Sequence, residues 1–179
     1  MKILFFCHWS SFRQGSKLRS WLDELATELS ICGNSVDFFH PIQNKLIDYD
    51  LIHIFSFQDF ETWVSIARTD VAVVVTPITG GFGSEEGDAP SYSRFFAAVD
   101  WGKRILKGWM QRRWPPYDEW NWIHAADLFL PLNSNWISYL EKRWFIPGCR
   151  IQVLPSGAAA AAREMQTIYR NVTGIHGKD

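Results

Sequence analysis

The segment between residues 8 and 16 carries the residue types that bind phosphate. It contains Arg13, Gly15 and Ser16 and leads directly into leucines at helical spacing. Free backbone N–H groups in the first turn of a helix bind phosphate oxygens, and an arginine adds a charge-assisted hydrogen bond. We therefore expect Arg13, Gly15 and Ser16 to face a diphosphate. The alternative is that Gly15 only permits a tight turn.

A second set of side chains has the chemistry to hold a carbohydrate. A histidine and a tryptophan follow the first apolar run, and a glycine-rich acidic segment over residues 78–90 follows the fourth. Glycines let the backbone approach a ligand closely, and carboxylates accept hydrogen bonds from sugar hydroxyls. The alternative for the acidic residues is an ordinary solvated loop. The predicted contact residues are His8, Trp9, Thr79, Gly80, Gly81, Glu85, Glu86, Asp88 and Asn133.

The third candidate is a basic and aromatic stretch on a helix predicted over residues 92–112. Trp101, Ile105 and Trp109 recur every four residues and therefore share one face of that helix. Basic side chains around an aromatic face suit contact with anionic lipid headgroups. The alternative is that the tryptophans pack on neighbouring elements or on a protein partner. The predicted membrane-contact residues are Trp101, Lys103, Arg104, Ile105, Lys107, Trp109, Arg112 and Arg113.

Several other kinds of site are not expected. The five histidines lack metal-ligand spacing, and Cys7, Cys32 and Cys149 form no paired motif, so we expect buried thiols, no disulfide and no bound metal or cofactor. His53 lies within an apolar run, which indicates a semi-buried, hydrogen-bonded histidine rather than a catalytic one. Residues 39–41 (Phe-His-Pro) end the second apolar run where a dinucleotide site would need an acidic residue.

The elements that must position these residues fit one α/β domain. The chain has 179 residues, 47% of them hydrophobic, and a net charge of -1, which gives no general affinity for nucleic acid. Its opening apolar run is too short for a signal peptide or a membrane span, so we expect a cytoplasmic protein. Apolar runs predict strands buried on both faces over residues 2–7, 36–39, 51–55, 71–76, 127–132 and 150–154.

Helical patterns alternate with these strands. Leu18, Leu22, Leu25 and Leu29 share one helix face, and Gly33 stands where that helix should end. Further helices are expected over residues 59–67 and 92–112, and from a cap at Asn133 or Ser134 to residue 144. This order predicts a Rossmann-like parallel sheet flanked by helices on both faces, in a single domain with a C-terminal crossover helix.

Five short motifs occur in a fixed order over residues 1–157, and together they resemble the N-terminal domain of family 4 glycosyltransferases. The resemblance implies one of two facing Rossmann-like domains, the one that binds the acceptor. Where many members carry a histidine after the fourth strand, this chain has Ile78 and Thr79, so the resemblance assigns no catalytic residue. The motifs are Gly33-Asn34-Ser35-Val36, Asp50-Leu51-Ile52-His53-Ile54, Val75-Thr76-Pro77, Ala126-Asp127-Leu128-Phe129-Leu130 with Asn133-Ser134, and Ile151-Gln152-Val153-Leu154-Pro155-Ser156-Gly157.

After Gly157 the character of the sequence changes. Five alanines, residues 158–162, are interpreted as a linker, and an amphipathic pattern with Tyr169 predicts a helix over residues 163–173. This segment (163–174) is similar to the final helix of the family, which crosses back and packs on the N-terminal domain. The resemblance therefore implies that the alanines stand in place of the second domain, which binds the sugar nucleotide.

The resemblance implies an enzyme that transfers a sugar, with retention, from a nucleotide diphosphate sugar to a carbohydrate or lipid-linked acceptor. It also implies peripheral contact with the inner face of a membrane. Without the second domain, we expect this chain to be inactive. One alternative is a non-catalytic Rossmann-like module that binds sugars or a partner, or acts as a scaffold. Another is a small flavodoxin-like enzyme, against which stands the lack of a Ser/Thr-rich phosphate loop after the first strand.

Overall fold

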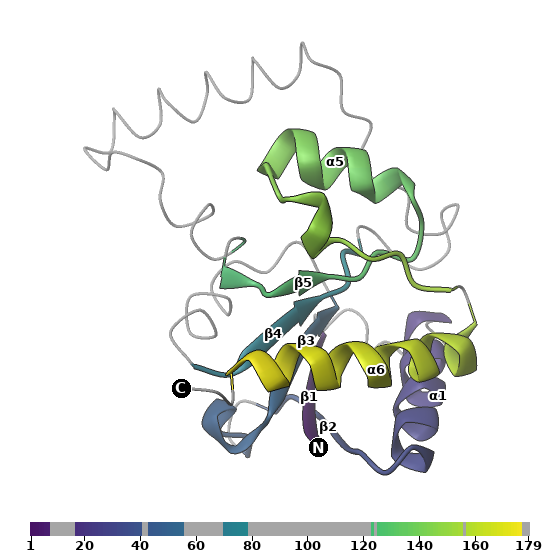
Figure 1. The fold of residues 1–179 in the computed structure, drawn as a ribbon. Coiled ribbons are helices and arrows are strands. Elements are labelled where there is room, and N and C mark those ends of the chain that lie inside the picture. The colour runs from purple at the N-terminus through teal and green to yellow at the C-terminus, as the bar shows by residue number, and fades with distance from the viewer. Residues whose placement is uncertain are drawn as a thin grey trace, which may run out of the picture.

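A computed structural model describes residues 1–7, 17–40, 43–55, 70–78, 123, 125–155 and 157–176. Its sheet has five strands in the order β2-β1-β3-β4-β5, and every neighbouring pair is parallel (Figure 1). This order is one of the two common arrangements of doubly wound α/β proteins. The strands are β1 (Lys2–Cys7), β2 (Ser35–Phe38), β3 (Leu51–Phe55), β4 (Ala72–Val75) and β5 (Leu128–Phe129).

The three central strands are apolar along their buried length, except at His53, because both faces of the sheet are covered. All residues of β3 and β4 are buried, as are all residues of β1 after Lys2. A strand covered on one face would alternate between apolar and polar residues, whereas these runs are continuous. The outer strand β2 is only half-buried, as its position at the edge of the sheet requires.

Helices pack on both faces of the sheet, as the sequence predicted. Helices α1 (Lys17–Ile31) and α6 (Ala158–His176) lie side by side on one face, and α6 crosses in front of the strands in Figure 1. Helix α5 (Asn135–Trp144) covers the other face with Trp136, Leu140 and Trp144. Two single-turn 3-10 helices complete the described elements, η2 (Leu46–Asp48) and η4 (Gly148–Arg150). The predicted Rossmann-like α/β fold is confirmed.

The first helix ends at Gly33, the position expected from the sequence. Gly33 has a φ of 85°, in the left-handed region that glycine adopts at little cost. Its N–H donates to the Ser30 carbonyl at 2.9 Å, and the Asn34 N–H donates to the Leu29 carbonyl at 3.2 Å. These two bonds satisfy two carbonyls in the last turn of α1 and turn the chain into β2.

The alanine run is helical, so its interpretation as a separate linker is corrected. Helix α6 begins at Ala158, five residues before the predicted start, because alanine is the strongest helix former. Ala158, Ala161 and Ala162 are buried in the same core as α1. Their small side chains let α6 approach its neighbours closely, and the helix continues through His176.

Two predicted strands are shorter in the structure. The strand predicted over residues 127–132 is reduced to β5, and residues 150–154 form one isolated bridge between Ile151 and Phe129. The Gln152 N–H still donates to the Phe129 carbonyl at 2.9 Å, and the Leu154 N–H to the Pro131 carbonyl at 2.8 Å. Pro131 has no N–H of its own, and this interrupts the ladder at the edge of the sheet.

The cysteines differ in burial, which corrects the expectation that all three are buried. Cys7 is buried and Cys32 half-buried, whereas Cys149 is exposed in the surface turn η4. None of the three forms a disulfide. The helices predicted over residues 59–67 and 92–112 lie outside the described residues.

Candidate functional site

The carboxyl ends of the parallel strands meet at one edge of the sheet, which is where open α/β sheets bind ligands. The direction of winding changes between β1 and β3, because β2 lies on one side of β1 and the remaining strands on the other. At this point Cys7 is the register partner of Phe55. Helix α1 leads from the end of β1 back to the start of β2, so its positive N-terminal end also lies at this edge. This edge is the candidate site.

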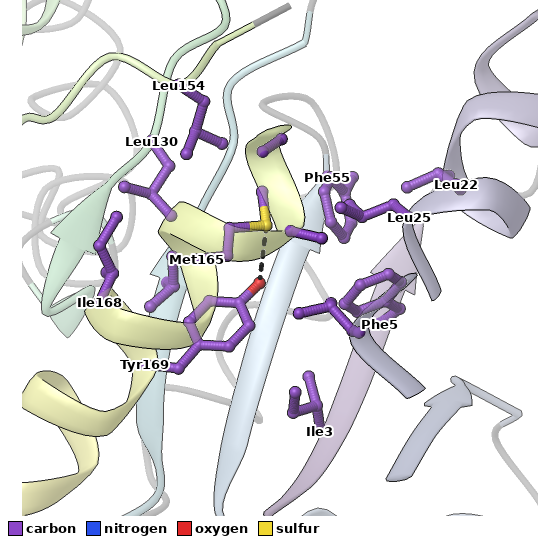
Figure 2. Packing of buried hydrophobic residues seen from close by; sticks show 14 of the residues in the cluster. Ile3, Phe5, Leu22, Leu25, Phe55, Leu130, Leu154, Met165, Ile168 and Tyr169 are labelled. Atoms are coloured by element: carbon purple, nitrogen blue, oxygen red, sulfur yellow. Dashed lines mark hydrogen bonds between the residues drawn. The ribbon is translucent and has the colours of Figure 1, made fainter. Parts of the chain in front are cut away.

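A buried polar network lies below the candidate site, between the sheet and α6. His53 is at the centre of β3, and its side chain is fully buried. Its Nε2 is 2.8 Å from the Thr76 hydroxyl, and its Nδ1 is hydrogen-bonded to the Tyr169 hydroxyl. The Tyr169 hydroxyl also contacts the Met165 sulfur at 3.3 Å, the dashed contact in Figure 2. Three elements, β3, the end of β4 and α6, are therefore joined through one imidazole.

The contacts of the network indicate which histidine nitrogen carries the hydrogen. If Nδ1 is protonated, Thr76 donates to Nε2, Nδ1–H donates to Tyr169, and Tyr169 donates to Met165, so that every polar hydrogen has an acceptor. In the other tautomer Nε2–H donates to Thr76, and the described part of the chain gives the Thr76 hydroxyl hydrogen no acceptor. Because buried polar groups are nearly always paired, we assign the Nδ1–H tautomer.

Burial keeps the titratable groups around this network uncharged near neutral pH. It lowers the pKa of His53 well below its ordinary value and raises the pKa of Tyr169 well above its own. Burial also raises the pKa of the Cys7 thiol to about 12, against a smaller lowering by the charge of Arg19. Neither a thiolate nucleophile nor a charged acid is therefore available from these residues. His53 is hydrogen-bonded, as predicted, and its burial is complete rather than partial.

A second polar cluster closes the connection between β2 and β3. The Tyr49 hydroxyl donates to the Asp37 carboxylate at 3.0 Å and accepts from the Asn44 amide at 2.6 Å. Burial raises the pKa of Tyr49, and the hydrogen bond to Asp37 raises it further. The ammonium group of Lys2 lies 4.5 Å from the centre of the Tyr49 ring. These contacts satisfy one another, so the cluster fixes a loop rather than forming an open site.

Of the predicted site residues, Asn133 is the one that the structure describes. It follows β5 at the carboxyl edge, and its side-chain oxygen accepts the Asn135 N–H at 3.0 Å. Asn133 thus supplies the hydrogen bond at the start of α5, whereas Ser134 makes no side-chain capping bond. The diphosphate-facing residues, the other acceptor contacts and the predicted membrane helix, residues 8–16, 79–88 and 101–113, lie outside the described residues.

The described residues contain neither a cluster of metal-ligating side chains nor a helix that could span a membrane. No three His, Cys, Asp or Glu side chains in this part of the chain gather in a way that could hold a metal ion. No helix among the described elements is long and apolar enough to cross a membrane.

The partners of His53 were missed at the sequence level because no local signal identifies them. Tyr169 is separated from His53 by 116 positions, and Thr76 by 23. Spacing shows only that His53 interrupts an apolar strand and that Tyr169 lies on the apolar face of a helix. A polar residue in a strand buried on both faces needs a partner, and this is the signal that was present.

Comparisons with known proteins do not identify a family, so the fold is assigned from the strand order of this chain. No family model matches the sequence, and a search of curated proteins found no match. Among solved structures, the chain is similar to a flavodoxin from Streptococcus pneumoniae TIGR4, with 17% identity over 59% of this chain and 73% of that one. The TM-score of 0.31 is too low to carry an argument about function.

Proposed function

We propose that residues 1–157 form the acceptor-side domain of a two-domain retaining glycosyltransferase. The donor would be a nucleotide diphosphate sugar, and the acceptor a carbohydrate or a lipid-linked sugar. The observation that carries the proposal is the buried contact between His53 and Tyr169. His53 belongs to the third-strand motif of the resemblance and Tyr169 to its terminal helix, so two parts recognised separately in the sequence meet in the core.

In this proposal the chain's own residues bind and orient the two substrates. The N-terminal end of α1, with Arg13, Gly15 and Ser16 before it, would face the diphosphate. His8, Trp9, Asn133 and the segment over residues 79–88 would contact the acceptor at the carboxyl edge of the sheet. The side chains that hold the nucleotide and the sugar would belong to the second domain, so this chain binds substrates without transferring sugar.

We further propose that the basic and aromatic segment over residues 101–113 contacts a membrane. Its tryptophans and basic residues would place the acceptor cleft beside the inner face of the bilayer, where a lipid-linked acceptor is presented. This orientation suits a peripheral cytoplasmic enzyme.

A second candidate is a non-catalytic module that binds a carbohydrate or a protein partner. One observation favours it: α6 begins directly after Gly157, and its first turns are packed in the core. Residues 152–157 alone separate the bridge at Ile151 from α6, so the sheet and this helix share one core without a second domain between them. The two candidates differ in their affinity for nucleotide diphosphates.

Calorimetric titration of the purified chain separates these candidates. For the glycosyltransferase domain we expect an oligosaccharide acceptor to bind with a dissociation constant up to about 1 mM, as ordinary substrates do. UDP-, GDP- or ADP-sugars should bind at least about tenfold more weakly, and Arg13→Gln should weaken them further because a charge-assisted bond is lost. Arg170→Gln changes an exposed arginine on α6 and serves as the matched control.

The results of this titration decide between the two candidate functions. Acceptor binding without any nucleotide affinity would support the non-catalytic module. Transfer or hydrolysis of a sugar nucleotide by this chain would contradict the proposal that it lacks the residues needed for transfer. Binding of neither ligand class would contradict the glycosyltransferase domain and a carbohydrate-binding module, and would favour a module that binds a protein partner.

A further inference from the structure

Helix α6 packs on one face of the sheet beside α1. It follows the bridge at Ile151 through residues 152–157, and its apolar face packs on the sheet and on α1. Figure 2 shows Met165, Ile168 and Tyr169 above the strands, with Phe5 and Leu25 beside them. Between α6 and the end of α1, the half-buried Gln166 amide donates to the Cys32 carbonyl at 2.9 Å. Helix α6 contributes no strand to the sheet, so its removal leaves the strand order intact.

The groups that face His53 in the described structure carry no charge. Phe5 on β1 and Phe55 on β3 contact its ring at centroid distances of 5.8 and 3.9 Å, and Tyr169 on α6 contacts it at 5.7 Å. Thr76, at the end of β4, is neutral. The nearest ion pair on α1, Arg19 with Asp23, is at the surface. No carboxylate in this part of the chain is therefore placed to stabilise a protonated imidazole.

Protonation of the His53 imidazole would also disrupt the hydrogen bonds of this network. In the assigned tautomer Nε2 accepts the Thr76 hydrogen, so a proton added to Nε2 would displace that donor. The charge would remain in an apolar core without a counter-ion, and this is why burial lowers the pKa of His53 well below its ordinary value of 6.5. Detaching α6 removes Tyr169 from the imidazole and returns the ring to water.

We propose that α6 is a proton-sensitive strap, which detaches from the sheet as a unit and does so more readily when His53 is protonated. The detached form binds a proton near pH 6.5, and the docked form does so only at lower pH. Below about pH 6.5 the detached form therefore gains tenfold in relative population for each pH unit, and above it the population is unchanged. This inference is independent of the proposed glycosyltransferase function.

Amide hydrogen exchange measured between pH 7.5 and 5.0 tests the strap. After correction for the intrinsic pH dependence of exchange, the opening constants of α6 amides should rise about 30-fold over this range, as the linkage relation gives for one group titrating at 6.5. Opening constants of β1 and β3 amides should rise much less, because the sheet remains folded when α6 detaches.

Two variants and one direct measurement complete the test. His53→Asn places a neutral amide near Nδ1 and should make α6 opening independent of pH, whereas His40→Asn, at an exposed position, should leave the 30-fold rise unchanged. If His53→Asn does not fold, the nitrogen shifts of His53 in the unaltered protein decide, and they should show a neutral Nδ1–H ring at pH 5.0. The strap is refuted by a His53 that titrates near 6.5 in the docked protein, by a flat response of α6, or by an equal rise in the sheet.

Discussion

Tyr169→Ala is expected to lower the free energy of unfolding by about 3–5 kcal/mol, the range for deleting a buried aromatic side chain. Tyr169 is fully buried, and its ring lies between α6 and the sheet (Figure 2). Its removal leaves a cavity there and leaves the His53 Nδ1–H without its acceptor. For a chain of this length, the midpoint of thermal unfolding should fall by roughly 6–20 °C. Urea unfolding followed by circular dichroism measures the change in the free energy of unfolding.

Tyr169→Phe separates the hydroxyl from the ring. The ring keeps its packing, and the loss of one buried hydrogen-bond partner should cost about 1–3 kcal/mol. A value within about 0.5 kcal/mol of the unaltered protein, which is typical of surface changes, would show that the network does not stabilise the docked helix. In that case the assignment of the Nδ1–H tautomer would also lose its support.

Trp136→Ala is expected to have a comparable effect on the opposite face of the sheet. Trp136 is the largest fully buried side chain among the described residues, and it packs from α5 onto the core that includes Val73 and Val75. Truncation should lower the free energy of unfolding by about 3–5 kcal/mol. Trp136→Phe retains an aromatic ring, and its cost should be about 1–2 kcal/mol. Chemical unfolding monitored by circular dichroism provides the comparison.

Phe145→Gly is the matched control at the end of the same helix. Phe145 is 67% exposed and has a φ of 54°, in the left-handed region that favours glycine. Relief of this strain should leave stability unchanged or raise it by up to about 1 kcal/mol. A loss as large as that of Trp136→Ala would contradict the assignment of α5 as the cover of the second face.

The sheet could be predicted because its strands are buried on both faces. Continuous apolar runs such as residues 51–55 are typical of a covered parallel sheet, and their alternation with helices indicates the fold class. Gly33 was recognisable because a glycine after a run of helical leucines ends a helix. The order of the strands could not be predicted, because apolar runs do not show which strands pair.

The sequence-based interpretations were wrong where the surroundings of a residue in the fold decide its structure. Residues 158–162 looked like a linker because they are low in complexity, but alanine favours a helix whenever a core is available to pack against. The interpretation of Cys149 as buried failed because its place in a surface turn depends on the surrounding proline and glycine. Asn133 was expected to contact a ligand and was also one of two expected helix caps, and its oxygen does accept the hydrogen bond at the start of α5.

Amide chemical-shift mapping with an oligosaccharide acceptor tests the central claim most directly. If the carboxyl edge of the sheet is the binding site, the shifts should be concentrated at Cys7, Phe55, Ile78 and Asn133, which follow or end four different strands. Ile31 and Ile47, in the connections that lead back to the starts of strands, should not move. Shifts concentrated at those two residues, or no shifts at saturating acceptor, would contradict the assignment of an acceptor-binding domain.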